Sequence, residues 1–294
     1  MEIAYILQVH KNPGQLNKFI REISSDGSDI YIHVDKKSVQ SVSSQIIKGD
    51  NIKIIEESVS VTWSDISQVD ATLNLFQSLK ASHKKYDFIV FKTGQDLLIK
   101  RGIKDYFENY PDKIFMNMRL VKHDNPQTYF WYVRWPKVTR NLYDSMFHPY
   151  RIFRTALIRL YMMGINVFPN AAKLPGDYAL FKGSAYFCIP GYVLEYIINF
   201  LAENPWYYEA FRNALAPDES FLPTLIMNSP YAANVIDDNL TFIKFGKSHK
   251  DHNHPVTLTM TDIPDIESSG KFFARKFDDG VDEKVVKYFC STCK

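Results

Sequence analysis

The sequence begins MEIAYILQVHKNPGQLNKFIREISSDGSDIYIHVD (residues 1–35), and this stretch decides the fold. The apolar run at residues 2–9 predicts a buried strand. The segment from Pro13 to Ser24 has apolar residues at helical spacing and predicts a helix, and residues 29–35 predict a second strand. A strand, a helix and a strand in this order are typical of a parallel sheet with crossover helices.

The alternation continues along the first third of the chain. We expect helices at 38–48 and 65–83, short strands near 52–61, and a strand at 86–92. The helix at 65–83 carries a stripe of apolar residues that should face the core: Ile66, Val69, Leu73, Phe76 and Leu79. The sequence therefore predicts an α/β fold with a mostly parallel, doubly wound central sheet flanked by helices.

The composition is that of a globular chain. Its 294 residues are 46% hydrophobic and 15% aromatic, so a large core is possible and we expect one domain over residues 1–294. The formal net charge of +2 and the pI near 8.2 give no overall attraction to nucleic acid, and we expect no nucleic-acid partner.

The first seven residues are too few, and too soon followed by polar residues, to predict a signal peptide or a membrane span. Three cysteines, Cys188, Cys290 and Cys293, do not suggest a disulfide framework and fit a reducing compartment, so the cytoplasm is the expected location. Cys290 and Cys293 have CxxC spacing. Zinc or redox chemistry stays open beside the simpler interpretation, a frayed terminal helix.

Three predicted strands end in polar residues. Because ligands of parallel α/β sheets bind at the carboxyl ends of the strands, the segments ending at His10, Asp35 and Asp96 should face one opening. Asp96 could position a ligand there, although an aspartate after Gly94-Gln95 is also an ordinary loop residue.

Residues 119–168 break the alternation with a basic, aromatic stretch: Tyr129, Trp131, Tyr132, Arg134, Trp135, Arg140, Arg151, Arg154 and Arg159. Aromatic rings stack on sugars and arginines bind hydroxyls and phosphates, so an acceptor platform is one interpretation. The segment His148–Phe168 could also be a basic amphipathic helix lying on a membrane, which would suit a lipid-linked acceptor. A packed insertion with solvated arginines is the third.

The second half returns to regular elements. Residues Tyr178–Cys188 predict an extended run, and Pro190–Glu203 predict a helix with proline in its first turn. In the segment Ala216-Pro217-Asp218-Glu219-Ser220-Phe221, the proline and both acids fit a helix N-terminus, where carboxylates are favoured.

Six blocks of residues carry a resemblance to a known family. They are Ile32-His33-Val34-Asp35-Lys36-Lys37-Ser38, Trp63-Ser64, Thr93-Gly94-Gln95-Asp96, Phe181-Lys182-Gly183-Ser184-Ala185-Tyr186-Phe187, Pro217-Asp218-Glu219 and Phe273-Ala274-Arg275-Lys276-Phe277-Asp278. In this order and approximate spacing, the chain resembles glycosyltransferase family 14, the core-2/I-branching β-1,6-N-acetylglucosaminyltransferases and peptide O-xylosyltransferases. The resemblance covers nearly the whole chain. Because the sequence predicts no secretory anchor and has few cysteines, we expect a bacterial member of the family.

The resemblance implies a GT-A-like nucleotide-sugar-binding fold, inversion of stereochemistry, and no metal or other cofactor. It implies a nucleotide-binding half over residues 1–118 and an acceptor-binding, catalytic half over residues 119–294. The implied reaction moves a sugar, N-acetylglucosamine first, from a UDP-sugar to a hydroxyl of a glycan or lipid-linked glycan. From the lack of a predicted anchor and the few cysteines, we expect a role in surface polysaccharide synthesis. Transfer of xylose from UDP-xylose and a non-catalytic glycan- or nucleotide-binding protein are the alternatives.

The resemblance also implies residue roles. Glu219 matches the catalytic base, for which a carboxylate is suited. The implied donor-binding residues are Val9, His10, Asp35, Arg275 and Lys276, with the Lys276 ammonium facing the diphosphate in place of a metal. The implied acceptor-binding or positioning residues are Asp96, Ser184, Tyr186, Asp218 and Phe245.

Two positions depart from the family pattern. Phe245 stands where some relatives have a tryptophan, and Val256 where the animal enzymes have an arginine. Lys250, His252 or His254 could replace that arginine, and the same His-rich segment could in principle bind a metal.

Metal chemistry has one more candidate, Asp237-Asp238-Asn239, which also fits a hairpin turn between two short apolar runs. A metal-dependent sugar nucleotidyltransferase would need a glycine-rich loop and paired acids near the N-terminus, and the sequence has no glycine cluster there.

Overall fold

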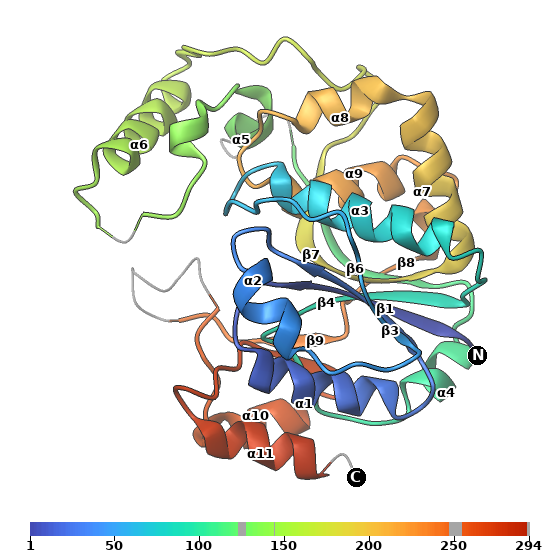
Figure 1. Ribbon diagram of the computed structural model, residues 1–294. Helices are drawn as coiled ribbons and strands as arrows, with labels where there is room; N and C mark the ends of the chain where they lie inside the picture. Colours follow the sequence, from blue (N-terminus) through green and yellow to red (C-terminus); the bar gives the residue numbers. More distant parts are fainter. Residues whose placement is uncertain (123–127, 144, 247–254, 293–294) are drawn as a thin grey trace.

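The computed structural model describes residues 1–122, 128–143, 145–246 and 255–292. Within these residues, seven strands form a central sheet in the order β3-β2-β1-β4-β7-β6-β8, and three form a second sheet in the order β5-β10-β9 (Figure 1). The strands of the central sheet are β1 (Ile3–Val9), β2 (Asp29–Val34), β3 (Ile52–Ile54), β4 (Phe88–Thr93), β6 (Ile114–Leu120), β7 (Phe181–Pro190) and β8 (Val235–Asp237). Those of the second sheet are β5 (Leu97–Leu98), β9 (Thr241–Ile243) and β10 (Phe273–Arg275).

The central sheet is parallel except at one strand. Strands β3, β2, β1 and β4 pair in parallel, and β6 pairs in parallel with β8. Strand β7 lies between β4 and β6 and runs antiparallel to both. The predicted α/β class with a mostly parallel sheet flanked by helices is confirmed.

Helices cover both faces of the sheet (Figure 1). On one face, α1 (Pro13–Ser24) and α11 (Glu283–Thr292) share a buried cluster with β1, β2 and the second sheet. On the other face, α3 (Ser67–Ala81), α7 (Gly191–Glu203), α8 (Pro205–Phe211) and α9 (Phe221–Met227) share a second cluster. The shorter helices are α2 (Val39–Val42), α4 (Ile103–Glu108), α5 (Tyr129–Tyr132) and α10 (Ile263–Ser268). The sheet is thus buried on both sides, as parallel sheets require.

The first α/β unit follows directly from its sequence. Strand β1 is buried along almost its whole length because its side chains are apolar on both faces. Helix α1 begins at Pro13, whose missing N–H is unneeded in a first turn. Its apolar residues Leu16, Phe19, Ile20 and Ile23 are buried on one side.

Some expected elements are shorter or different. The helix expected at 38–48 is only α2 and the 3-10 turn Ser43–Gln45, and the strands expected near 52–61 reduce to β3. The predicted stripe on α3 packs against the core, with Leu73 only partly buried. Residues Asp237–Asn239 do not form a hairpin, because β8 belongs to the central sheet and β9 to the second one.

An arm projects from the body between β6 and β7 and contains α6 (Pro149–Met162), at the upper left of Figure 1. Its inner side packs through Leu157 on Val133, Trp135 and Leu215, a third buried cluster. In the part of the chain that the structure describes, no helix has the length and apolar character needed to cross a membrane.

Two glycines in the first turns of helices α7 and α1 differ in the space around them and predict a difference in stability. A methyl group on Gly191 would lie 2.0 Å from the Tyr86 carbonyl oxygen, whereas one on Gly14 of α1 meets nothing within 4 Å. Gly191→Ala should therefore lower the free energy of unfolding by about 1–3 kcal/mol. Gly14→Ala should leave it unchanged or raise it by up to about 1 kcal/mol. Urea unfolding measures the free energy of unfolding of both variants. Equal changes in the two variants would contradict the close contact at Gly191.

Candidate active site

The residues predicted to face one opening lie at one edge of the central sheet. Val9 ends β1, Asp35 follows β2, and Asp96 follows β4. The Asp35 amide donates a hydrogen bond to the Val9 carbonyl at 2.8 Å, so the first two strand ends are directly joined. Because β7 is antiparallel to β4, the first residues of β7 come to the same edge.

Asp35 is held by its own turn. Its side chain accepts a 2.9 Å hydrogen bond from the Lys37 amide, and the Lys37 ammonium lies 3.6 Å from its other oxygen. Beside it, desolvation of the ring lowers the pKa of His10, and the charges of Lys11 and Lys276 act in the same direction while Asp35 opposes them. His10 therefore contributes a neutral ring between a carboxylate and cations at neutral pH.

Lys276 is a half-buried cation at this edge. Partial burial lowers its pKa, and so do the charges of Lys11 and Arg275, while Asp278 raises it. Its ammonium forms no ion pair with any residue that the structure describes. Lys11, by contrast, is paired with Asp278 at 3.0 Å.

Arg275 points into the protein. Its Nε lies 3.2 Å from Asp96 Oδ1, an ion pair without the alignment of a hydrogen bond, and its guanidinium lies 4.5 Å from the centre of the Tyr186 ring. Asp96 is fully buried and accepts a 2.7 Å hydrogen bond from the Thr93 amide. Burial raises the pKa of Asp96, and the charges of Arg275 and Lys92 oppose that shift.

Glu219 lies in a 3-10 turn, η4 (Pro217–Glu219), just before α9. Its Oε2 is 2.8 Å from the Lys182 ammonium, and 39% of its side chain is exposed. The same ammonium lies 5.4 Å from the centre of the Phe130 ring. Since Lys182 occupies Oε2, Oε1 is the oxygen left open to a ligand among the described contacts.

Asp218 has a different environment from its neighbour. Gln68 donates a 3.3 Å hydrogen bond to Oδ2, whereas Oδ1 is buried and has no hydrogen-bond partner among the described residues. Burial, reinforced by the charge of Glu219, raises the pKa of Asp218 to about 7. Neither acid caps α9, whose N-cap residue is Ser220, so helix capping does not account for them.

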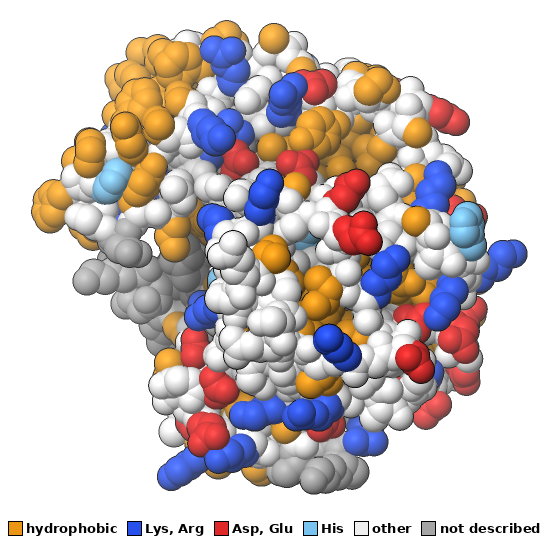
Figure 2. Space-filling model, viewed as in Figure 1, with side chains coloured by type: hydrophobic (Ala, Val, Ile, Leu, Met, Phe, Trp, Pro, Cys, Tyr) orange, Lys and Arg blue, Asp and Glu red, His pale blue; other side chains and the backbone are white. Residues whose placement is uncertain are grey.

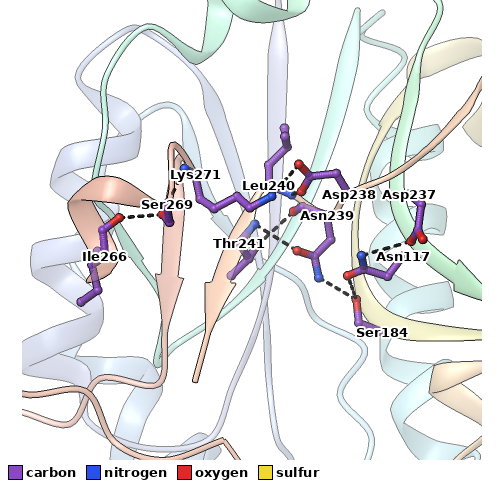
Figure 3. A network of polar contacts seen from close by, with 10 residues as sticks. All are labelled: Asn117, Ser184, Asp237, Asp238, Asn239, Leu240, Thr241, Ile266, Ser269 and Lys271. Carbon is purple, nitrogen blue, oxygen red and sulfur yellow. Dashed lines mark hydrogen bonds and ion pairs between the residues drawn. The ribbon is translucent and has the colours of Figure 1, made fainter. Parts of the chain in front are cut away.

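Ser184 belongs to a polar network that joins the two sheets (Figure 3). Asn239 donates a 2.8 Å hydrogen bond to its hydroxyl, and Asn117 lies on its other side. Asp237 accepts from Asn117, whereas Asp238 binds Lys271 at 2.6 Å, so these two carboxylates face different partners. No group of three metal-ligating side chains occurs within the described ranges.

Several predicted features lie apart from these contacts. Phe245 is 53% exposed and its backbone pairs with Pro255. Lys250, His252 and His254 lie outside the described residues, as does Cys293. Its CxxC partner Cys290 is half-buried on α11.

Several residues of the basic, aromatic stretch at 119–168 are packed inside the protein. Trp131 and Trp135 are 3% and 1% exposed, so they offer no stacking surface. Arg140 is buried in a 2.8 Å ion pair with Asp65. Arg154 lies 5.5 Å from the centre of the Trp63 ring. The side chains of Tyr129 and Tyr132 are not described by the structure.

A cavity of about 350 Å³ is lined by Tyr161, Lys173 and Tyr178, among others. None of the predicted site residues lines this cavity.

Two residues of the site escaped the sequence reasoning. Lys182, the partner of Glu219, stands inside a quoted block, but nothing in the sequence says that it meets an acid nearly forty positions away. Lys92 is fully buried, donates a 2.8 Å hydrogen bond to Thr241 and lies 4.2 Å from the centre of the Phe273 ring. The sequence offered one signal for Lys92, because it is a single lysine at the end of an apolar strand.

Comparison with known proteins gives consistent matches. The family model described as "Core-2/I-Branching enzyme" matches residues 3–268. A xylosyltransferase of Ciona intestinalis is 23% identical over 98% of this chain and 34% of its own length. The "Beta-1,3-galactosyl-O-glycosyl-glycoprotein beta-1,6-N-acetylglucosaminyltransferase 4" of Danio rerio is 22% identical over 97% of this chain and 68% of its own length. The chain thus spans about a third of the length of the Ciona protein.

The crystal structure of mouse xyloside xylosyltransferase 1 in its apo form matches 93% of this chain and 97% of that one, with a TM-score of 0.42 and 11% identity. We draw no argument from a structural similarity at this level.

The fold and the edge cluster define an α/β protein of the class that binds its ligand at the carboxyl ends of a mostly parallel sheet. The family match then identifies it further. The chain belongs to the core-2/I-branching enzyme family, a family of glycosyltransferases.

The environment of Asp218 predicts a pH-dependent effect on stability. Its carboxyl ionises near pH 4 in an unfolded chain and near pH 7 in the folded one. Because the folded state holds this proton more tightly, the group costs stability as the pH rises above about 4, and the cost is complete above about 7. The free energy of unfolding of Asp218→Asn, relative to that of wild type, should therefore rise by on the order of 1–3 kcal/mol between about pH 5 and pH 8.

Urea unfolding at both pH values measures this gain. Glu195→Gln, which changes an exposed carboxylate on α7, is the matched control and should show little difference between the two pH values. If Asp218→Asn differs from wild type equally at both pH values, the buried environment does not hold a proton on Asp218.

Proposed function

We propose that this chain is an inverting glycosyltransferase that moves a sugar from a UDP-sugar to a glycan hydroxyl, with Glu219 as the base. The observation that carries the proposal is the position of Glu219: its carboxylate is held by Lys182 at 2.8 Å and remains 39% exposed beside the strand ends. Membership of the core-2/I-branching family supports it.

In the proposed reaction, Glu219 takes the proton of the acceptor hydroxyl as that oxygen attacks the anomeric carbon. The bond from this carbon to the diphosphate breaks on the opposite face, which inverts the configuration, and UDP leaves with the bonding electrons. Lys182 positions the carboxylate through Oε2 and leaves Oε1 directed to the acceptor. The proton ends on Glu219 and is released to solvent.

The leaving diphosphate needs compensating charge. We propose that Lys276 supplies it, because its ammonium has no carboxylate partner among the described residues. Arg275 is occupied by Asp96 and Tyr186, so its role is to hold the strand end that carries Lys276. With this cation in place, the proposal needs no divalent metal.

The other predicted residues take roles in the same proposal. Asp35 binds the ribose or uracil, with Val9 and His10 beside it. Ser184, Tyr186 and Phe245 contact or position the acceptor side. These assignments divide the donor and acceptor roles between residues 1–118 and 119–294, except that Lys276 of the second part serves the donor.

The donor sugar has two candidates. We propose N-acetylglucosamine first, because the Danio rerio relative is named as an N-acetylglucosaminyltransferase and this chain covers 68% of its length. Xylose is the second, because relatives named xylosyltransferase match over 98% of this chain. Surface polysaccharide, free or lipid-linked, is the proposed acceptor class.

Replacing the proposed base tests the mechanism. Glu219→Gln keeps the shape and removes the proton acceptor, so sugar transfer should fall by about 100- to 10,000-fold while UDP affinity stays the same. The assay measures UDP release from UDP-N-acetylglucosamine and from UDP-xylose with purified protein, and the faster donor identifies the sugar. Glu195→Gln serves as the exposed-acid control. A Glu219→Gln variant with wild-type rates would show that Glu219 is not the base.

Replacing Lys276 tests the phosphate contact. A hydrogen bond to a charged group contributes about 1.5–3 kcal/mol, so Lys276→Ala should weaken UDP binding by about 10- to 100-fold. Calorimetric titration with UDP in buffer containing EDTA measures the affinity without a metal. Lys284→Ala, at an exposed lysine of α11, is the control. Wild-type protein that binds UDP only with Mg²⁺, or a Lys276→Ala variant with unchanged affinity, would contradict the assignment.

A further inference from the structure

The arm that contains α6 carries an unusual share of exposed apolar side chains. Of the 17 large hydrophobic residues that are exposed in the described chain, 11 lie between Val138 and Val167. Figure 2 shows hydrophobic side chains gathered at the upper left, where Figure 1 places α6. The most exposed are Phe147 at 84%, Met163 at 74% and Met162 at 61%. A contiguous exposed apolar surface of this kind marks an interaction site.

Helix α6 has two apolar sides with different partners. Leu157 faces the third buried cluster and is 6% exposed. At 100° per residue, Ile152, Arg159 and Met163 fall on the opposite side, and all three are exposed. We define the α6 outer surface as Ile152, Arg159, Met162 and Met163 of the helix, with Met146 and Phe147 before it and Ile165 after it. Folding of the described chain leaves this surface uncovered.

The segment between β6 and β7, residues 121–180, carries eight arginines and lysines and three aspartates. Residues 128–176 contain seven arginines and lysines and a single acidic residue, Asp144, which lies outside the described residues. Arg134, Lys137, Arg159 and Lys173 are exposed and form no ion pair with described residues. An apolar surface that includes the exposed Arg159, on an arm with an excess of cations, complements a bilayer with anionic headgroups, because apolar side chains enter the interface while cations stay at the phosphate level.

We propose that the α6 outer surface docks this protein on bilayers that contain anionic lipids. Phe147, Met162 and Met163 enter the headgroup boundary from the two ends of α6, and Arg159 between them binds lipid phosphate. Docking of this kind needs no change in the fold, since the inner side of α6 stays packed on Leu215 and Trp135.

The arm is attached directly to the candidate active site. The Leu215 amide donates a 2.8 Å hydrogen bond to the Phe130 carbonyl, and Leu215 precedes the turn that holds Glu219. On the other side, Phe130 lies under the Lys182 ammonium, the partner of Glu219. A docked arm therefore brings the catalytic carboxylate close to the bilayer surface. This last step rests on the proposed function and predicts that lipid-linked glycans are the acceptor class, whereas docking itself does not depend on transfer.

Vesicle flotation of the full chain tests the docking. Wild-type protein should float with vesicles of phosphatidylcholine and phosphatidylglycerol, and much less with phosphatidylcholine alone. The double substitution Phe147→Glu/Met163→Glu should weaken binding by at least about tenfold, because two apolar side chains leave the interface and two negative charges meet the headgroups. Arg159→Glu should weaken it by about fivefold or more, and raised salt should weaken wild-type binding.

Val281→Glu is the matched control, because Val281 is 64% exposed outside the arm, and it should bind like wild type. UDP binding by every variant shows that the fold and the donor site are intact and separates a failure of docking from a failure of the proposed function. Wild-type protein that floats with neither vesicle overturns docking, as does equal binding by the double variant. Docking is also overturned if wild-type protein is a dimer that does not bind vesicles and the double substitution dissociates that dimer. The surface would then be an interface between two copies of the chain.

Discussion

The reversal of one strand determines which residues meet at the active site. Strand β7 runs antiparallel to both β4 and β6, so its first residues lie where the parallel strands end. Lys182, Ser184 and Tyr186 thereby join Asp35 and Asp96 at one edge. Such a strand must approach its neighbours closely, and a methyl group at Gly183 would lie 1.8 Å from the Asn117 carbonyl oxygen. Glycine is required where β7 enters the sheet, and this constraint sets the position of the β7 residues at the edge of the candidate site.

The second sheet depends on buried charges that compensate one another. Arg275 and Asp96 are drawn together at 3.2 Å in a place where an isolated charge would be costly, and the Tyr186 ring covers the guanidinium. Lys92 is a third buried group. Burial lowers the pKa of Lys92, and interactions with Cys188 and Asp96 raise it. Because Arg275 is committed inward, the next residue, Lys276, stays free of carboxylates among the described contacts. The inward pairing of one cation therefore leaves the next one without a carboxylate partner among the described residues.

The sequence predicts what local pattern determines and misses what the folded chain brings together. The bounds of α1 follow from Pro13 and the apolar spacing after it, and β1 follows from an apolar run. The residues Asp237–Asn239 look like a hairpin because two short apolar runs flank them, but the runs join different sheets, and only three-dimensional packing decides that. The Lys182–Glu219 pair is likewise invisible locally. Trp131 and Trp135 fit a sugar platform by residue type, yet they are buried in packing.

The two neighbouring acids show how one turn can give two carboxylates different tasks. In η4, Asp218 turns toward Gln68, and its Oδ1 is buried without a partner among the described residues. Glu219 turns outward to Lys182 and solvent. The negative charge of Glu219 adds to burial in raising the pKa of Asp218, so a proton on Asp218 relieves the repulsion between the two acids. Burial of one acid and pairing of the other therefore concentrate the negative charge of the turn on Glu219, which is the more exposed of the two side chains.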